Sequence, residues 1–196
     1  MKNQKTGVIR KISIWVGACL LVIAIAILIS WQYGIHTSAE RTEYYVNSLS
    51  ELMPTPQGAV PEARRDNAMA TVSLEGTDFI GILELPRYSA ILPVGAKWGQ
   101  PNQYPCRFSG SVYDRTLQIG GTSQKGQLDF FREISVGDTV LFTDMEGNRY
   151  TYAVTDLRYE KSADQAALRR KESALTLFIK NVYAFEYLIV FCNAVT

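Results

Sequence analysis

The longest apolar run in the sequence lies near its N-terminus, where the twenty residues from Ile12 to Trp31 carry no charge. At about 1.5 Å per residue, a helix of this length reaches across a bilayer core of about 30 Å. A cleaved signal peptide would have a shorter apolar region that ends in small residues. We therefore expect residues 12–31 to form a retained transmembrane anchor.

Charged residues flank this run unevenly, and their distribution predicts its orientation. Lys2, Lys5, Arg10 and Lys11 precede the run, whereas the segment that follows it opens with mixed charge. Basic residues next to a membrane span tend to remain in the cytoplasm. We therefore expect residues 1–11 to form a cytoplasmic tail and the C-terminal domain to lie outside the cell.

The segment that follows, residues 32–77, is predicted to form a helical stalk and a linker. Apolar residues recur at near-helical spacing up to Leu52. Between Pro54 and Pro61, three prolines and a glycine then interrupt any regular period. The folded domain is therefore expected at residues 78–196.

The predicted domain is dominated by short segments with the composition or the alternation of β-strands. In the clearest segment, Tyr150, Tyr152 and Val154 alternate with small or polar residues, which is typical of a half-buried strand. We expect eight strands, at Phe79–Leu85, Ala90–Val94, Arg107–Val112, Thr116–Gly120, Thr139–Thr143, Asn148–Leu157, Leu175–Lys180 and Glu186–Cys192.

Two further segments have weaker signals. Leu128, Phe131 and Ile134 recur at helical spacing and predict a short helix over residues 128–134. Residues 162–171 are mostly polar and predict a loop or one or two helical turns. Eight short strands with only minor helices favour an all-β fold in which the sheet closes into a small barrel.

The net charge of +1 argues against one class of partner. A nucleic-acid-binding domain needs a basic surface, so we expect no nucleic-acid partner. The sequence also contains no metal-ligand spacing, no P-loop and no dinucleotide-binding fingerprint, so we expect no metal and no cofactor.

The chain has three cysteines, of which Cys19 lies within the apolar run. Cys106 and Cys192 lie in the predicted exterior domain, where a disulfide can persist. Cysteine also packs well as a small buried hydrophobe. The sequence leaves open whether these two residues form a disulfide or remain two buried thiols.

Several motifs follow one another in a characteristic order along the predicted domain. They are Ile82–Pro86, Ile91–Val94, Pro105–Ser111, Leu117–Gly121, Asp129–Phe131, Val136–Asp138 and Phe142–Asn148. Together they resemble the sortases, the membrane-anchored cysteine transpeptidases of Gram-positive bacteria. The resemblance covers Phe79 to about Cys192, extends to the predicted anchor, and implies a closed eight-stranded β-barrel.

The resemblance also implies a thiolate nucleophile, a histidine that carries protons, and an arginine that stabilises the substrate and the developing oxyanion. The family's histidine follows the glycine pair Gly120-Gly121, and this position holds Thr122. Its cysteine ends the strand that here ends at Lys180, and its arginine opens the last strand, at Tyr187. All three family positions are substituted.

Neither the histidine nor the remaining cysteine offers a clear replacement. His36, which is the only histidine, follows the apolar run closely, and we interpret it as an interfacial residue. Cys192 lies within an apolar strand with no basic neighbour that would favour a thiolate, so we interpret it as a buried thiol.

Hydroxyl groups and Lys180 provide a second set of alternatives. Thr122 and Ser123 carry hydroxyls, and a lysine can act as the base for such a nucleophile if it is desolvated and within hydrogen-bond reach. The simpler interpretation is that Lys180 faces solvent or pairs with a carboxylate such as Asp129 or Glu186.

The sequence therefore predicts a membrane-anchored, extracytoplasmic protein with a sortase fold and no catalytic activity. Its groove is expected to bind a sorting-signal-like peptide or a cell-surface protein, because such binding needs no nucleophile. The alternative is an active sortase transpeptidase that attaches proteins to the cell wall or to pili with non-standard catalytic residues. A third interpretation is a decayed gene product without a role, and the fold cannot decide among the three.

Overall fold

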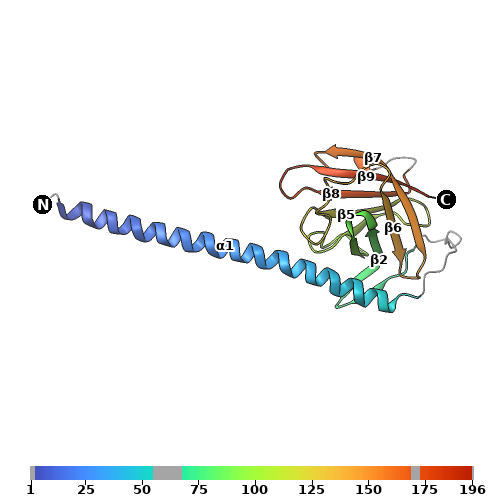
Figure 1. Cartoon of the computed structure of the whole chain (residues 1–196), viewed down its shortest axis with the longest axis horizontal. Coiled ribbons are helices and arrows are strands. Elements are labelled where there is room, and N and C mark those ends of the chain that lie inside the picture. Colours follow the sequence, from blue (N-terminus) through green and yellow to red (C-terminus); the bar gives the residue numbers. More distant parts are fainter. Residues whose placement is uncertain (1–2, 55–67, 169–172, 196) are drawn as a thin grey trace. The chain divides into compact units, whose positions relative to one another are not determined.

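The computed structural model describes residues 3–54, 68–168 and 173–195, and it describes the side chains of residues 15–29, 40–54, 68–164, 166–168 and 173–195. The chain divides into two compact units, Met1–Thr37 and Ser38–Thr196. The long helix α1 (Asn3–Leu52) runs through both units (Figure 1). The second unit therefore includes the end of this helix and begins well before the predicted domain boundary at residue 78.

Helix α1 contains the predicted anchor. Its described side chains from Trp15 to Ile29 are exposed. Among the described residues, no helix is both long and apolar enough to cross a membrane. Both ends of the predicted span, residues 12–14 and 30–31, lie outside the residues whose side chains are described, and so do the predicted tail and His36.

Strands make up most of the second unit. In the described part of the chain they are β1 (Val72–Leu74), β2 (Thr77–Leu85), β3 (Ala90–Gly95), β4 (Cys106–Ser109), β5 (Leu117–Thr122), β6 (Thr139–Asp144), β7 (Arg149–Glu160), β8 (Leu175–Lys180) and β9 (Tyr187–Ala194). A 3-10 helix, η1 (Pro86–Tyr88), separates β2 from β3, and the single-turn helix α2 (Gln165–Leu168) lies between β7 and β8.

Eight of these strands close a barrel. Their order is β2-β3-β4-β5-β8-β9-β7-β6, and β6 pairs with β2 to complete the circle. Strand β1 pairs only with β2 and lies outside the closed ring. Neighbouring strands are antiparallel except for β3–β4 and β5–β8, which are parallel. The predicted eight-stranded all-β barrel with short helices is confirmed.

Three local expectations were wrong. Strand β1 was not predicted, because its three residues carry too short a pattern to detect. Residues 128–134 form turns rather than a helix, although Leu128, Phe131 and Ile134 are buried as expected. Successive turns, such as the one closed by the bond from the Phe131 N–H to the Leu128 carbonyl (3.2 Å), reproduce the inward spacing of a helix.

The strand predicted at Arg107–Val112 ends early, at Ser109, because the chain turns at Gly110. This glycine has a φ of 75°, in the left-handed region that glycine adopts without steric cost. A Cβ at this position would lie 2.0 Å from the carbonyl oxygen of Thr116. The close approach brings the chain back toward β5, which pairs with β4.

The buried residues form an inner core and two outer clusters. Alternate residues of β8, Leu175, Leu177 and Ile179, point into the barrel and belong to the inner core. On one side of the barrel, Tyr45 and Leu49 of α1 pack with a second cluster. A third cluster lies on the outer face of the sheet, and it consists of Leu168, Phe178, Ile189 and Phe191. Strands β8 and β9 are therefore covered on both faces.

Candidate functional site

The three positions that the family resemblance singled out, Thr122, Lys180 and Tyr187, meet on adjacent strands. Thr122 lies opposite Lys180 in the parallel pair β5–β8, and Lys180 lies opposite Tyr187 in the antiparallel pair β8–β9. Residues opposite one another on paired strands have Cα atoms about 5 Å apart and project to the same face. The three residues therefore form one row, which we call the Thr122–Lys180–Tyr187 row.

The row lies on the outer face of the barrel. Along β8, Ile179 belongs to the inner core, whereas Phe178 belongs to the outer cluster. Because side chains alternate along a strand, Lys180 shares the outer face with Phe178. Along β9, Tyr187 likewise packs against the outer cluster.

The members of the row differ in exposure. Thr122 is 2% exposed, Tyr187 is half-buried, and Lys180 is exposed. None of the ion pairs in the described part of the chain involves Lys180. Of the two carboxylates suggested as its partner, Glu186 instead accepts a hydrogen bond from the Asn181 side chain at 3.0 Å. Lys180 thus faces solvent, as the simpler interpretation expected.

The two hydroxyls near the row are used in holding the loops together. The Thr122 hydroxyl donates to Oε1 of Gln127 at 3.3 Å, and the amide of Gln127 donates to the Asn102 carbonyl at 2.6 Å. Ser123 is 4% exposed, and its Oγ accepts the N–H of Val182 at 3.0 Å. Neither hydroxyl is arranged as an accessible nucleophile.

Both thiols of the barrel are sealed from solvent. Cys106 and Cys192 are free and 0% exposed, so the open question of a disulfide is answered in favour of two buried thiols. Burial raises the pKa of Cys192 to about 12, and burial also raises the pKa of Cys106. Because the thiolate is the nucleophilic form, neither residue is poised for acyl transfer.

An aromatic cluster covers the outer face directly beside the row. Trp98 comes from the loop between β3 and β4, Phe108 from β4 and Phe178 from β8, and each pair of ring centroids is 5.4 Å apart. We call these three residues the outer aromatic cluster. A Cβ on Gly120 would lie 2.3 Å from Cζ of Phe178 and 2.6 Å from Cζ3 of Trp98, so the glycine leaves room for both rings.

Several sortases are among the solved structures that this fold resembles. Sortase A from Corynebacterium diphtheriae has a TM-score of 0.53 and 16% identity, over 82% of this chain and 84% of its own. The pilus-related sortase C of Group B Streptococcus has a TM-score of 0.54 and 16% identity, over 84% and 91%. The corresponding values for sortase C-3 of Streptococcus pneumoniae are 0.53, 16%, 83% and 84%. The fold is that of the sortases.

At this level of identity the likeness concerns the fold alone. No protein-family model and no curated protein matches the sequence. Within the described residues, no group of three or more His, Cys, Asp or Glu side chains is arranged to hold a metal ion.

The turn between β8 and β9 presents aromatic side chains next to the row of this sortase-like barrel. Tyr183 is 72% exposed and Phe185 is fully exposed. Asn181, which is buried, holds the turn by accepting the Tyr183 N–H at 3.0 Å and by donating to Glu186. The exposed rings are therefore presented by an ordered turn.

Sequence reasoning found the row but missed its surroundings. Nothing in the local pattern indicated that Trp98 would reach Phe178 and Gly120. The exposure of Phe185 was also unexpected, although an aromatic residue in a short link between two strands is a usable signal.

Proposed function

We propose that this protein is a membrane-anchored, extracytoplasmic sortase-fold protein that binds a peptide or protein partner and does not catalyse acyl transfer. The observation that carries the proposal is the row itself. Thr122, Lys180 and Tyr187 adjoin one another at the positions where the family resemblance expects a histidine, a cysteine and an arginine.

The chemistry of the row supports a non-catalytic role. Acyl transfer requires an activated nucleophile, a proton carrier and a group that stabilises the oxyanion. Thr122 is already bonded to Gln127. Tyr187 offers a phenol in place of the parallel N–H donors with which arginine holds an oxyanion or a carboxylate. The two buried thiols lie outside the row.

The exposed groups at this end of the barrel suit binding instead. Lys180 supplies a cation, and Tyr183, Phe185 and Tyr187 supply aromatic surface in reach of solvent. Recognition of an extended peptide rests on backbone hydrogen bonds and side-chain contacts, neither of which needs a catalyst. The occupant we propose is a sorting-signal-like peptide or the cell-surface protein that carries one.

Membrane attachment is the second part of the proposal. The apolar side chains of α1 from Trp15 to Ile29 are exposed, with Leu20 and Val22 more than 60% accessible. Water is a poor environment for so much apolar surface, whereas lipid tails would cover it. Protease added to wall-stripped intact cells should remove the barrel domain, and protection of the domain while a cytoplasmic control survives would contradict this topology.

Activity is tested with the purified full chain in detergent. The chain is mixed with a panel of sorting-signal peptides and a glycine or diamine acceptor, and product is followed by mass spectrometry beside an active sortase. We expect no cleavage, no transfer product and no covalent adduct with thiol-directed sortase inhibitors. Turnover by the unmodified chain would favour the alternative, an active transpeptidase with non-standard residues.

Binding is tested with the same peptides carrying a fluorophore. We expect a rise in anisotropy with the full chain, and a weaker rise when Phe185→Ala or Lys180→Glu alters the exposed groups at the row. Val136→Ala is the matched control, because Val136 is also exposed but adjoins Gly137, whose N–H bonds to Val154, six residues along β7 from the strand partner of Tyr187. Equal binding by all variants would show that the partner contacts another surface.

A further inference from the structure

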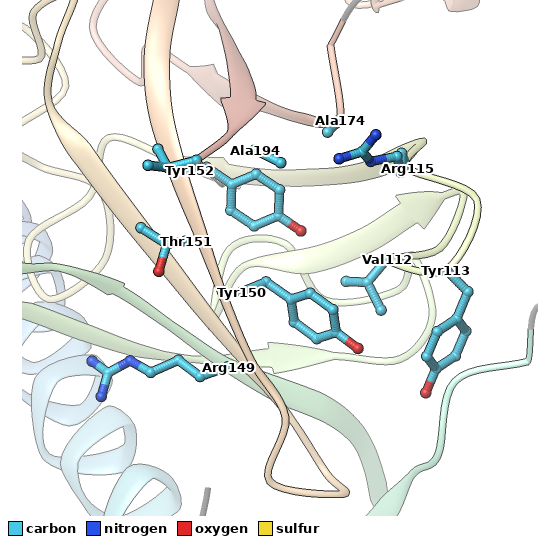
Figure 2. A pocket seen from close by; sticks show the side chains of 10 residues that line it. Val112, Tyr113, Arg115, Arg149, Tyr150, Thr151, Tyr152, Ala174 and Ala194 are labelled. Atoms are coloured by element: carbon cyan, nitrogen blue, oxygen red, sulfur yellow. The ribbon is translucent and has the colours of Figure 1, made fainter. Parts of the chain in front are cut away.

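A cavity of about 390 Å³ opens at the end of the barrel opposite the row. The row lies where β5 and β8 end and β9 begins, whereas this cavity lies near the start of β5 and β8 and the end of β9. Figure 2 shows its lining, which includes Val112, Arg115, Tyr150, Tyr152, Ala174 and Ala194. Its volume falls within the usual range for small-molecule sites, about 300–1,000 Å³.

A buried hydroxyl points into this cavity. Tyr152 is only 3% exposed, and its ring belongs to the inner core. Figure 2 shows its hydroxyl directed into the space between Arg115 and Val112. The Tyr152 hydroxyl makes no hydrogen bond to a described residue. Every side-chain polar atom that is closed to solvent in the described residues has a partner, so this hydroxyl is not closed to solvent but opens into the cavity. Burial raises the pKa of Tyr152, which keeps the hydroxyl protonated and available as a donor at neutral pH.

Arg115 supplies a cation at the same place. Its side chain is exposed, and it forms no ion pair with any residue that the structure describes. Arg149, the other arginine of the cavity, is already bonded to Glu84 at 3.0 Å. Arg115 is therefore the guanidinium that remains available to a ligand.

The backbone of Arg115 adopts a conformation that is unfavourable for a residue with a side chain. Its φ is 58°, in the left-handed region. A residue with a Cβ loses roughly 1 kcal/mol there relative to its ordinary conformation, whereas glycine does not. Glycine at this position would therefore relieve the backbone while removing the guanidinium.

The carboxylate of Asp144, on the Tyr150 side of the cavity, is already bonded within the chain. Asp144 accepts hydrogen bonds from the N–H groups of Glu146 and Asn148, from the Asn148 side chain and from the Tyr150 hydroxyl. The Tyr150 hydroxyl is thus turned to Asp144, at 3.1 Å, while the Tyr152 hydroxyl is not. The available donors therefore converge at the Arg115 side of the cavity.

We propose that this cavity binds a carboxylate attached to an apolar body. The Arg115 guanidinium and the Tyr152 hydroxyl hold the carboxylate, because arginine offers two parallel donors to such a group. Val112, Ala174 and the Tyr150 ring contact the apolar body. The carboxylate belongs either to a small free acid or to the C-terminus of a peptide, and the site is separate from the one proposed at the row.

The first experiment uses sodium 4-phenylbutyrate as the probe and 4-phenylbutyramide as its uncharged counterpart. Calorimetry with the full chain in detergent should show saturable binding of the acid, and binding of the amide weaker by at least about tenfold. Equal binding of acid and amide, or no binding of the acid up to about 10 mM, would overturn the proposal.

Variants separate binding from folding. Arg115→Gly should weaken binding of the acid by at least about tenfold while the melting temperature stays the same or rises, because glycine accepts the left-handed conformation. Tyr152→Phe, which removes only the hydroxyl, should also weaken it. Arg132→Gln and Tyr159→Phe are matched controls on exposed residues away from the cavity and should bind as the unmodified chain does. Full affinity in Arg115→Gly would contradict the assignment.

A second arm identifies the source of the carboxylate. A hexapeptide ending in phenylalanine is compared with its C-terminal amide under the same conditions. Tighter binding of the peptide acid than of 4-phenylbutyrate, lost on amidation and in Arg115→Gly, assigns the cavity to a peptide C-terminus. Binding of 4-phenylbutyrate alone assigns it to a small acid.

Discussion

The two ends of the barrel, one with the row and the other with the cavity, differ in whether their polar side chains are bonded within the chain. At the row, the hydroxyls of Thr122 and Ser123 are bonded to the loops around them, and neither Cys106 nor Cys192 lies in the row. At the cavity, the Tyr152 hydroxyl and the Arg115 guanidinium have no partner among the described residues. Donors left to solvent or to a ligand therefore distinguish the cavity from the row.

The ends also differ in how they are filled. The outer aromatic cluster of Trp98, Phe108 and Phe178 covers the face beside the row. At the other end, small residues such as Ala174 and Ala194 leave open volume between the strands. An end that the chain has packed with its own rings suits contact through exposed residues, whereas an open end suits a small ligand.

The largest effect is expected from rebuilding the row. The variant Thr122→His/Lys180→Cys/Tyr187→Arg should turn over sorting-signal peptides where the unmodified chain shows none. The gain should be several orders of magnitude, because members of a catalytic unit act together. Transfer product is measured by mass spectrometry.

The control for this experiment is the double variant Thr122→His/Tyr187→Arg, which keeps Lys180 and should remain inactive. Circular dichroism establishes that each variant is folded. A folded triple variant without activity would mean that the adjacency of the three positions is not sufficient, and that the outer aromatic cluster excludes the substrate.

A smaller effect is expected from crowding the outer aromatic cluster. Gly120→Ala should lower the free energy of unfolding by about 1–3 kcal/mol or more, because the new methyl group overlaps the rings of Phe178 and Trp98. Gly99→Ala is the matched control, since the nearest atom to its Cβ is 4.0 Å away. Urea unfolding measures both. A neutral Gly120→Ala would show that the rings move aside easily and that the face beside the row can open.

The smallest effect concerns the thiols. In a Cys19→Ser background, a maleimide reagent at pH 8 should label neither Cys106 nor Cys192 in the folded chain and should label both in urea. Labelling of the native chain at Cys192 would contradict its burial and return it to the list of nucleophile candidates.

The raised pKa of Cys192 has a consequence for stability with a definite sign. Below about pH 9 the thiol is protonated in both the folded and the unfolded chain. Between about pH 9 and about pH 12 only the unfolded chain loses the proton, so stability falls as the pH rises. Urea unfolding at pH 8 and pH 10.5 measures this, and Cys192→Ala should show a smaller loss than the unmodified chain.

Much of the fold could be predicted because its strands carry strong local patterns. Strand β7 alternates as expected, with Tyr150, Tyr152 and Val154 buried. The helix expected at residues 128–134 shows the limit, because apolar spacing specifies which side chains are buried and not which hydrogen bonds the backbone makes. Thr122, Lys180 and Tyr187 could also be singled out from the sequence, because each follows a recognisable motif.

The cavity could not be predicted, for a different reason. Arg115, Tyr152 and Ala174 come from separate segments and meet only through the pairing of β5, β7, β8 and β9. The left-handed backbone at Arg115 could not be predicted, because glycine or asparagine is the usual signal for that conformation and this position holds an arginine. The outer aromatic cluster was missed likewise, because Trp98 reaches it from a loop without any period.

The parallel pairing of β5 with β8 has a consequence for how the chain folds. These strands are far apart in the sequence, and the β6–β7 hairpin lies between them. A hairpin forms quickly from local contacts, whereas a non-local parallel pair must first close a long loop. We therefore expect β6 and β7 to form early and the β5–β8 pair to form late. Because the row and one wall of the cavity both depend on that pair, both proposed sites would be among the last parts of the molecule to assemble.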